Sequence, residues 1–248
     1  MSVMLVLFGI TADYGKEIDR RSVPEKIIDT VLAVERSSGV IVYSDHERAL
    51  VLTAHHTIDD ELDKAACCGC DYNISVLNFS NIIIPSLPEE FEVTYIEVDE
   101  LNDLAIIEIK TTRKLHAAKI FKGQVRFGQE IYVASNPQRL YKSLKSGIIS
   151  SPARFIRGSL SVEVDAMIIF GSSGGGVFTK DGEFVGTVKS VRLLNTGHCF
   201  DVWDHEGNWI DMECIRVPIP SIGFAAHPMI IKRFLLNSVF SKDFDYLR

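Results

Sequence analysis

The most informative stretch of this sequence is Phe170-Gly171-Ser172-Ser173-Gly174-Gly175-Gly176. A serine flanked by glycines is typical of a tight turn, because glycine adopts backbone angles that a residue with a Cβ resists. Such a turn can point several backbone N–H groups into one small space. A nucleophilic serine needs donors of this kind to stabilise the oxyanion that forms when a carbonyl is attacked. The same residues also suit a glycine-rich hairpin turn, so this stretch alone leaves both interpretations open.

Two segments far from this turn supply the partners that a nucleophilic serine requires. A hydroxyl barely ionises at neutral pH and needs a base, and His55 and His56 follow the apolar segment Val51 to Ala54. Asp103 stands at the start of the apolar run Leu104 to Ile109. A buried carboxylate at that position can hold one imidazole nitrogen and fix the tautomer. The sequence therefore offers a candidate set of serine, histidine and aspartate.

These segments resemble the motifs of trypsin-like serine peptidases. The histidine motif of that family, T-x-A-H, is similar to Thr53-Ala54-His55-His56. The aspartate motif is similar to Asn102-Asp103-Leu104-Ala105, and the serine motif, G-x-S-G-G, is similar to Gly171-Ser172-Ser173-Gly174-Gly175. The chain order His, Asp, Ser is also the order of that family. Five further segments resemble the HtrA/Deg branch: Phe127–Pro137, Ser146–Ser150, Val164–Ala166, Asp181–Gly186 and Ile222–Ala226. The resemblance runs from about Val34 to Phe234.

Many short apolar segments separated by turns are typical of β-barrels or sandwiches. The resemblance implies an all-β fold of two six-stranded β-barrels of the chymotrypsin type, with the active site in the cleft between them. We expect an N-terminal arm and the first barrel in residues 1–116, the second barrel in 117–226, and a C-terminal helix and tail in 227–248. A short helix is also predicted over Ser22 to Thr30, with Glu25 in its first turn. The closing helix is predicted over His227 to Phe240 from its apolar periodicity.

The resemblance also implies a role for each site residue. Ser173 is the expected nucleophile, His56 its general base and then acid, and Asp103 the group that orients the imidazole. The backbone N–H groups of Gly171 and Ser173 are the expected oxyanion hole. His55 stands where the family has a small residue. In an extended stretch the two histidines would point in opposite directions, and the register of the motif selects His56.

The expected substrate-binding residues are Met167 and the strand Thr187-Val188-Lys189-Ser190. Met167 stands at the family's pocket-base position and carries no acid, so we predict a small or medium aliphatic P1 residue. The strand is expected to pair with the substrate backbone as an added β-strand. Lys189 is unusual there; it could favour acidic substrates, but we expect a solvated side chain on the outer face. Ser172 has no charge to pair with a new N-terminus, so activation by N-terminal processing is not expected.

The composition of the chain argues against further classes of function. The chain has 248 residues, of which 46% are hydrophobic, and a formal net charge of −7. These values indicate a globular core and argue against a nucleic-acid-binding surface. No apolar stretch is long enough to span a membrane, so no membrane partner is expected. The apolar segment Met1 to Ile10 lacks a basic region and a clear cleavage site, and we interpret it as a strand or packing arm.

The five cysteines are Cys67, Cys68, Cys70, Cys199 and Cys214. An odd count with three crowded together is a poor disulfide framework. We therefore expect free thiols, a reducing compartment and a cytoplasmic location. The segment Cys67-Cys68-Gly69-Cys70 could hold a metal together with Cys199 or His198. Its spacing is not that of a standard zinc site, so neither a metal nor another cofactor is expected.

The segment Asn195 to Val217 is longer than an HtrA-like core needs. We predict a hairpin with a polar tip, which could gate the cleft or bind a partner. We expect no PDZ domain after the closing helix, so the resemblance is to the HtrA-like branch without that module. Regulation by a second copy of the chain or by an activating partner protein stays open.

The main hypothesis is a serine endopeptidase that acts on a protein or peptide substrate. One alternative is a catalytically silent pseudoprotease that serves as a protein-binding module. His55 and the apolar run Ile168 to Phe170, which depart from the family's pattern, keep this alternative open. A second alternative is a dedicated processing protease of a viral or defence system, with the same chemistry and one substrate.

Overall fold

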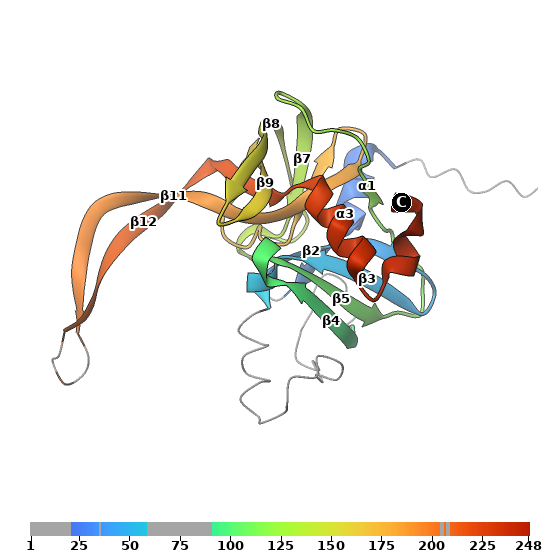
Figure 1. The fold of residues 1–248 in the computed structure, drawn as a ribbon, viewed down its shortest axis with the longest axis horizontal. Helices are drawn as coiled ribbons and strands as arrows, with labels where there is room; N and C mark the ends of the chain where they lie inside the picture. The colour runs from blue at the N-terminus through green and yellow to red at the C-terminus, as the bar shows by residue number, and fades with distance from the viewer. Residues whose placement is uncertain (1–20, 35, 59–90, 204–205, 207–208) are drawn as a thin grey trace, which may run out of the picture.

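The computed structural model describes residues 21–34, 36–58, 91–203, 206 and 209–248, and most of them lie in β-strands (Figure 1). The first sheet has the strand order β1-β2-β3-β5-β4. Its strands are β1 (Val31–Val34), β2 (Ser37–Ser44), β3 (Arg48–Thr53), β4 (Val93–Asp99) and β5 (Leu104–Lys110). The alternation of apolar residues over Asn73 to Ile84 also predicts a strand, and these residues lie outside the described ranges.

The second sheet has the order β10-β7-β8-β9-β12-β11-β6. Its strands are β6 (Lys119–Ile120), β7 (Glu130–Ser135), β8 (Ser143–Ile156), β9 (Ser159–Asp165), β10 (Gly176–Thr179), β11 (Glu183–Trp203) and β12 (Trp209–Ala226). An additional pairing of β10 with β11 closes strands β7 to β12 into a ring of six, and β6 adds to it in parallel with β11. The expected all-β fold with two sheets and a C-terminal helix is confirmed.

Strands β3 and β5 are apolar along almost their whole length because both of their faces are covered. One face packs inside the first sheet, where Val51 and Ile107 lie. The other face packs in a shared core with the second sheet and the C-terminal helix. Members of this shared core are Leu50, Leu52, Leu104, Ile106, Phe178, Phe184, Ile231 and Leu235. The two sheets are therefore joined by a continuous apolar core, which fixes the position of the site between them.

Both predicted helices are present. Helix α1 (Val23–Asp29) begins with a capping box, in which the Ser22 N–H donates to Glu25 Oε2 at 2.7 Å. Helix α3 (Pro228–Asn237) begins after His227, whose ring Nδ1 accepts a hydrogen bond from the Met229 N–H at 3.1 Å. The short 3₁₀ helix η4 (Ser241–Leu247) follows. None of the helices in the described ranges is long and apolar enough to cross a membrane.

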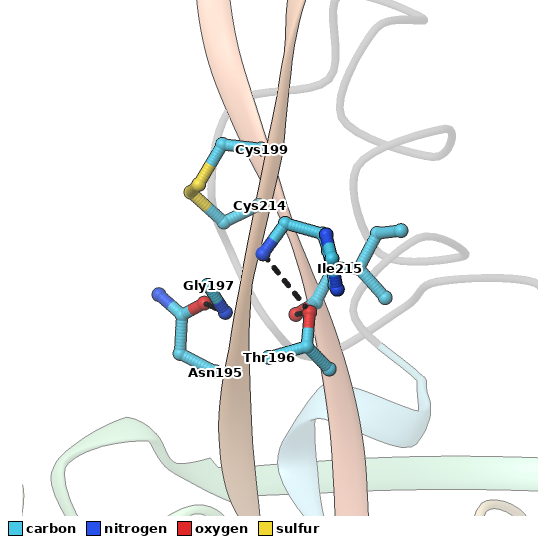
Figure 2. The surroundings of a disulfide bond; sticks show 7 residues. Asn195, Thr196, Gly197, Cys199, Cys214 and Ile215 are labelled. Carbon is cyan, nitrogen blue, oxygen red and sulfur yellow. Dashed lines mark hydrogen bonds between the residues drawn. A yellow bond between two sulfur atoms is a disulfide. The ribbon is translucent and has the colours of Figure 1, made fainter.

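Strands β11 and β12 continue past the barrel as a two-stranded ribbon that projects from the rest of the protein (Figure 1). This confirms the predicted long hairpin, although residues 204–205 and 207–208 at its tip lie outside the described part. Cys199 and Cys214 face each other across the ribbon and form a disulfide (Figure 2). The expectation of free thiols is therefore wrong for these two residues. Cys67, Cys68 and Cys70 lie outside the described ranges.

Candidate active site

The structure brings the three predicted catalytic residues together from two sheets. His56 lies in the 3₁₀ helix η1 (His55–Thr57), which follows β3. Asp103 lies between the 3₁₀ helix η2 (Glu100–Asn102) and β5. Ser173 lies in the glycine-rich turn that leads into β10 of the second sheet. The junction between the sheets thus unites residues that the sequence separates widely.

The hydrogen bonds around His56 form a continuous chain. Its Nδ1 lies 2.9 Å from Oδ2 and 3.0 Å from Oδ1 of Asp103, and its Nε2 lies 2.9 Å from Oγ of Ser173. The backbone N–H of His56 also donates to Asp103 Oδ1 at 3.0 Å. Because a carboxylate only accepts, this geometry places the imidazole proton on Nδ1 and leaves the Nε2 lone pair toward the serine hydroxyl.

The two histidines do not lie in an extended stretch, so that expectation is wrong. They occupy successive positions of η1, where three residues complete one turn and neighbours diverge by about 120°. His56 is the histidine that bonds to both Asp103 and Ser173. The register of the sequence motif therefore selected the residue that makes these contacts, although the backbone geometry assumed for it was different.

The turn that carries Asp103 is built by residues to which the sequence analysis assigned no role. Asp103 has φ 53° and ψ 52°, in the left-handed region. Just before it, Asn102 is 2% exposed and donates to the carboxylate of Asp99 through its backbone N–H at 3.1 Å and its side-chain amide at 2.7 Å. Ser159 Oγ donates to Asn102 Oδ1 at 2.9 Å. These bonds hold a backbone conformation that a non-glycine residue rarely adopts.

The turn that carries Ser173 requires glycine at two positions. Gly171 and Gly174 have φ angles of 88° and 77°. A Cβ on Gly174 would lie 1.9 Å from the Ser38 carbonyl oxygen, so even alanine has no room there. Ser38 of β2 holds the turn from the first sheet, since its N–H donates to the Ser173 carbonyl at 2.9 Å and its Oγ to the Gly171 carbonyl at 2.9 Å.

The peptide between Phe170 and Gly171 is held in one orientation. The Phe170 carbonyl accepts a hydrogen bond from the Gln138 N–H at 3.0 Å. Since a trans peptide points its carbonyl and the following N–H in opposite directions, the Gly171 N–H is directed away from Gln138. In the part of the chain that the structure describes, neither the Gly171 nor the Ser173 N–H donates to another protein group. Both donors are thus available to a ligand at the serine turn.

The predicted substrate-binding residues differ in how accessible they are. Met167 is 58% exposed, whereas the neighbouring Ile168 is buried and packs against Gly223, where a Cβ would lie 2.3 Å from Ile168 Cδ1. On β11, Thr187 pairs with Gly176 of β10. The next residue, Val188, exchanges backbone hydrogen bonds of 2.8 Å with the glycines that follow Ser173.

Lys189 contradicts the expectation of a solvated side chain, because it is only 7% exposed. Its Nζ donates to the Asn102 carbonyl at 3.3 Å and to Ser159 Oγ at 3.0 Å. Burial lowers the pKa of the Lys189 ammonium, and the nearby carboxylates of Asp103 and Asp99 oppose that shift. The strand alternation predicted two faces for β11, but the barrel covers the face that was expected to meet water.

Metal ligands do not gather at this site. Within the ranges that the structure describes, no group of three or more His, Cys, Asp or Glu residues is placed to hold a metal ion. The segment Cys67 to Cys70, which was considered as half of a metal site, lies outside those ranges.

Comparisons with known proteins agree with this geometry. The trypsin-like peptidase domain family matches residues 37–186. Serine endoprotease DegS of Haemophilus influenzae is 29% identical over 166 residues, which cover 65% of this chain and 43% of DegS. Periplasmic serine endoprotease DegP of Salmonella typhimurium is 29% identical over 169 residues, covering 65% of this chain and 31% of DegP. Mitochondrial serine protease HTRA2 of Drosophila grimshawi is 33% identical over 111 residues, covering 42% of this chain and 26% of HTRA2.

The chain spans less than half the length of these relatives. By name, DegP is a periplasmic protein and HTRA2 a mitochondrial one. The expected cytoplasmic location finds no support in these names or in the disulfide of the ribbon.

Proposed function

Because the chain belongs to the trypsin-like peptidase domain family, we propose that it is an HtrA-like serine endopeptidase that hydrolyses peptide bonds in proteins or peptides. The observation that carries this proposal is the chain of contacts at His56. Its two ring nitrogens lie 2.9 Å from an oxygen of Asp103 and 2.9 Å from Ser173 Oγ. A base in contact with both a nucleophile and an orienting carboxylate is the arrangement that acyl transfer requires.

The proposed reaction runs in two halves. Ser173 Oγ attacks the substrate carbonyl while its proton moves to His56 Nε2, and the Gly171 and Ser173 N–H groups stabilise the tetrahedral oxyanion. When the intermediate collapses, His56 protonates the departing amine and an acyl-enzyme remains. Water then attacks the acyl group, with His56 again as base, and releases Ser173. Asp103 stays ionised throughout and stabilises the imidazolium.

Specificity for a small or medium aliphatic P1 residue is part of the proposal. Met167 carries no charge that would attract Lys or Arg. Ile168 fills the space beside Gly223, which reduces the room for a long side chain. We place the substrate backbone on the edge of β11 at Lys189 and Ser190. The two preceding residues, Thr187 and Val188, are already paired with β10 and with the serine turn along that edge, so they are not available to the substrate backbone.

Cleavage of a peptide library derived from a whole proteome tests this function. The wild type is expected to generate new N-termini after Ala, Val and similar residues, and Ser173→Ala to generate none. Identical profiles for the two proteins would contradict the proposal and favour the pseudoprotease alternative. Weak cleavage of the library together with one sharp cut in a single protein would instead identify a dedicated processing protease.

A further inference from the structure

Lys189 lies on β11, and its side-chain ammonium group is buried. At this strand edge the proposed reaction uses only backbone groups of the protein to bind the substrate. Removing an ammonium from water is costly unless the protein supplies acceptors and opposite charge. Both are present here. The Asn102 carbonyl and Ser159 Oγ accept from Nζ at 3.3 Å and 3.0 Å. The carboxylates of Asp103 and Asp99 are near enough to stabilise the charged form.

The position of Lys189 connects the two halves of the site. Its neighbour Val188 accepts from the Gly174 N–H and donates to the Gly175 carbonyl, both at 2.8 Å. These glycines directly follow the nucleophile Ser173. The Lys189 side chain reaches the opposite way across the junction, to the carbonyl that precedes Asp103. Two successive residues of β11 therefore bind the serine turn and the aspartate turn.

The contact with the aspartate turn falls at its most constrained point. The Asn102 carbonyl belongs to the peptide that enters the left-handed conformation of Asp103. A donor on that carbonyl fixes the orientation of this peptide and, through it, the direction of the Asp103 side chain. The charged groups that face the ammonium are Asp99 at the end of β4 and Asp103 at the start of β5, with His56 beyond Asp103.

We propose that Lys189 is a positioning residue for the peptidase reaction, because its buried ammonium locks the Asn102–Asp103 turn against the strand that also holds the serine turn. This inference rests on the proposed function. Lys189 acts through Asp103 and His56 and touches no reacting atom. Its charge also interacts with the Asp103 carboxylate, which contacts His56.

Lys189→Met tests the inference, since methionine fills a similar volume without charge or donor. We expect kcat to fall about 10- to 100-fold with KM changed less than about twofold, as for a catalytic group displaced by a fraction of an ångström. The acidic limb of the kcat/KM profile is expected to move to higher pH, because the imidazolium of His56 loses a repelling neighbour. Lys189→Arg is expected to return that limb toward the wild-type position.

Two control variants separate positioning from general damage. Lys180→Met removes an exposed lysine, paired with Glu130 at 3.5 Å, from the turn before β11, and is expected to change neither kcat nor the limb. Ser159→Ala removes one acceptor but keeps the ammonium, so we expect a smaller loss in kcat and an unmoved limb. Thermal unfolding of each variant shows how much of the protein is folded at the assay temperature.

Titration of His56 by ¹⁵N NMR in the whole chain provides a readout that does not need turnover. A higher His56 pKa in Lys189→Met than in the wild type supports the inference. An unchanged His56 titration overturns it, whether or not the protein cleaves peptides. A rise in KM for acidic peptides alone would also overturn it and assign Lys189 to substrate binding. Absence of turnover in the wild type contradicts the proposed function, whereas the shift in His56 still decides the role of Lys189.

Discussion

Strand β11 passes through two environments along its length. Its inner part, Glu183–Val191, lies in the closed barrel, where β10, β12 and the serine turn bind its backbone and most side chains are buried. Its outer part, Arg192–Trp203, pairs with β12 and with no other strand of the described residues. Its described side chains are exposed, apart from a half-buried Val202. A two-stranded ribbon on its own is marginally stable in water, and here a disulfide crosses it.

In the inner part of β11, stability and chemistry depend on the same contacts. At the inner part, Val188 and Lys189 each bond to a turn that carries a proposed catalytic residue. Substitutions around that part are expected to change activity and folding together. Substitutions in the ribbon are expected to leave both properties of the barrels almost unchanged.

The largest expected effect separates the two neighbouring histidines. His56→Ala is expected to lower the rate of acylation by an activated ester roughly a million-fold, since it removes the proposed base. His55→Ala is expected to stay within about tenfold of the wild type. Stopped-flow acylation of the two variants measures the difference. Equal losses would contradict the assignment of the base to His56.

A pair of glycines with the same backbone angle tests the packing of the serine turn. Gly174 and Gly197 both have φ 77°, but a Cβ on Gly174 would meet the Ser38 carbonyl oxygen at 1.9 Å. No atom of the described residues lies within 4 Å of a Cβ on Gly197 in the ribbon. Gly174→Ala is expected to lower the free energy of unfolding by about 3 kcal/mol or more and to abolish cleavage. Gly197→Ala is expected to cost about 1 kcal/mol or less and to keep full activity. Urea denaturation and a peptide assay measure both, and similar losses in the two variants would refute the distinction.

His227, the N-cap of α3, gives the body of the protein a pH dependence. Its ring must be neutral at Nδ1 to accept from the Met229 N–H, and burial lowers the pKa of this imidazole from its usual value near 6.5. Below pH 6.5, His227 binds a proton more readily in the unfolded chain than in the folded chain. The free energy of unfolding therefore falls as the pH decreases.

His227→Asn keeps a capping acceptor without a titrating group. Between pH 7.5 and pH 5.5, we expect the free energy of unfolding of this variant to fall by about 1 kcal/mol less than that of the wild type, as measured by urea denaturation. The matched control is His198→Asn at an exposed position of the ribbon, which is expected to follow the wild type. A wild-type pH dependence in His227→Asn would show that the cap does not titrate in this range.

The smallest expected effect on the barrels comes from removing the disulfide. In the double variant Cys199→Ser/Cys214→Ser, the main thermal transition is expected to stay within about 1 °C, because the ribbon opens independently of the barrels. Hydrogen exchange in residues 192–219 is expected to accelerate at least about tenfold. A fall of several degrees in the main transition would show that the ribbon supports the barrels.

Much of the fold was predictable because it follows from local patterns. The capping box at Ser22, the apolar periodicity of α3 and the strand-like run of β5 each specify an element within a few neighbouring residues. The glycines around Ser173 likewise specify a turn that only glycine can form. The motifs around His56 and Asp103 fixed which residue of each segment aligns with the family's histidine and aspartate. The sequence therefore identified the residues that the structure brings together.

Other features depend on contacts that no single stretch encodes. The alternation of side chains along β11 assigns Lys189 to one face of the strand. Whether that face is buried depends on the packing of the barrel against the first sheet, which no local pattern encodes. The disulfide depends on the register of the ribbon, which sets Cys199 opposite Cys214, and the three cysteines elsewhere made the count misleading. The role of Asn102 was likewise hidden, because its partners are a carboxylate from β4 and a serine from β9.

The central claim is that Ser173 is an activated nucleophile. The most direct test is intact-mass spectrometry of the wild type and Ser173→Ala after treatment with a fluorophosphonate probe, with both proteins shown to be folded to the same extent. We predict one adduct per chain on the wild type and none on Ser173→Ala. No adduct on the folded wild type, or an equal adduct on both proteins, would contradict the claim.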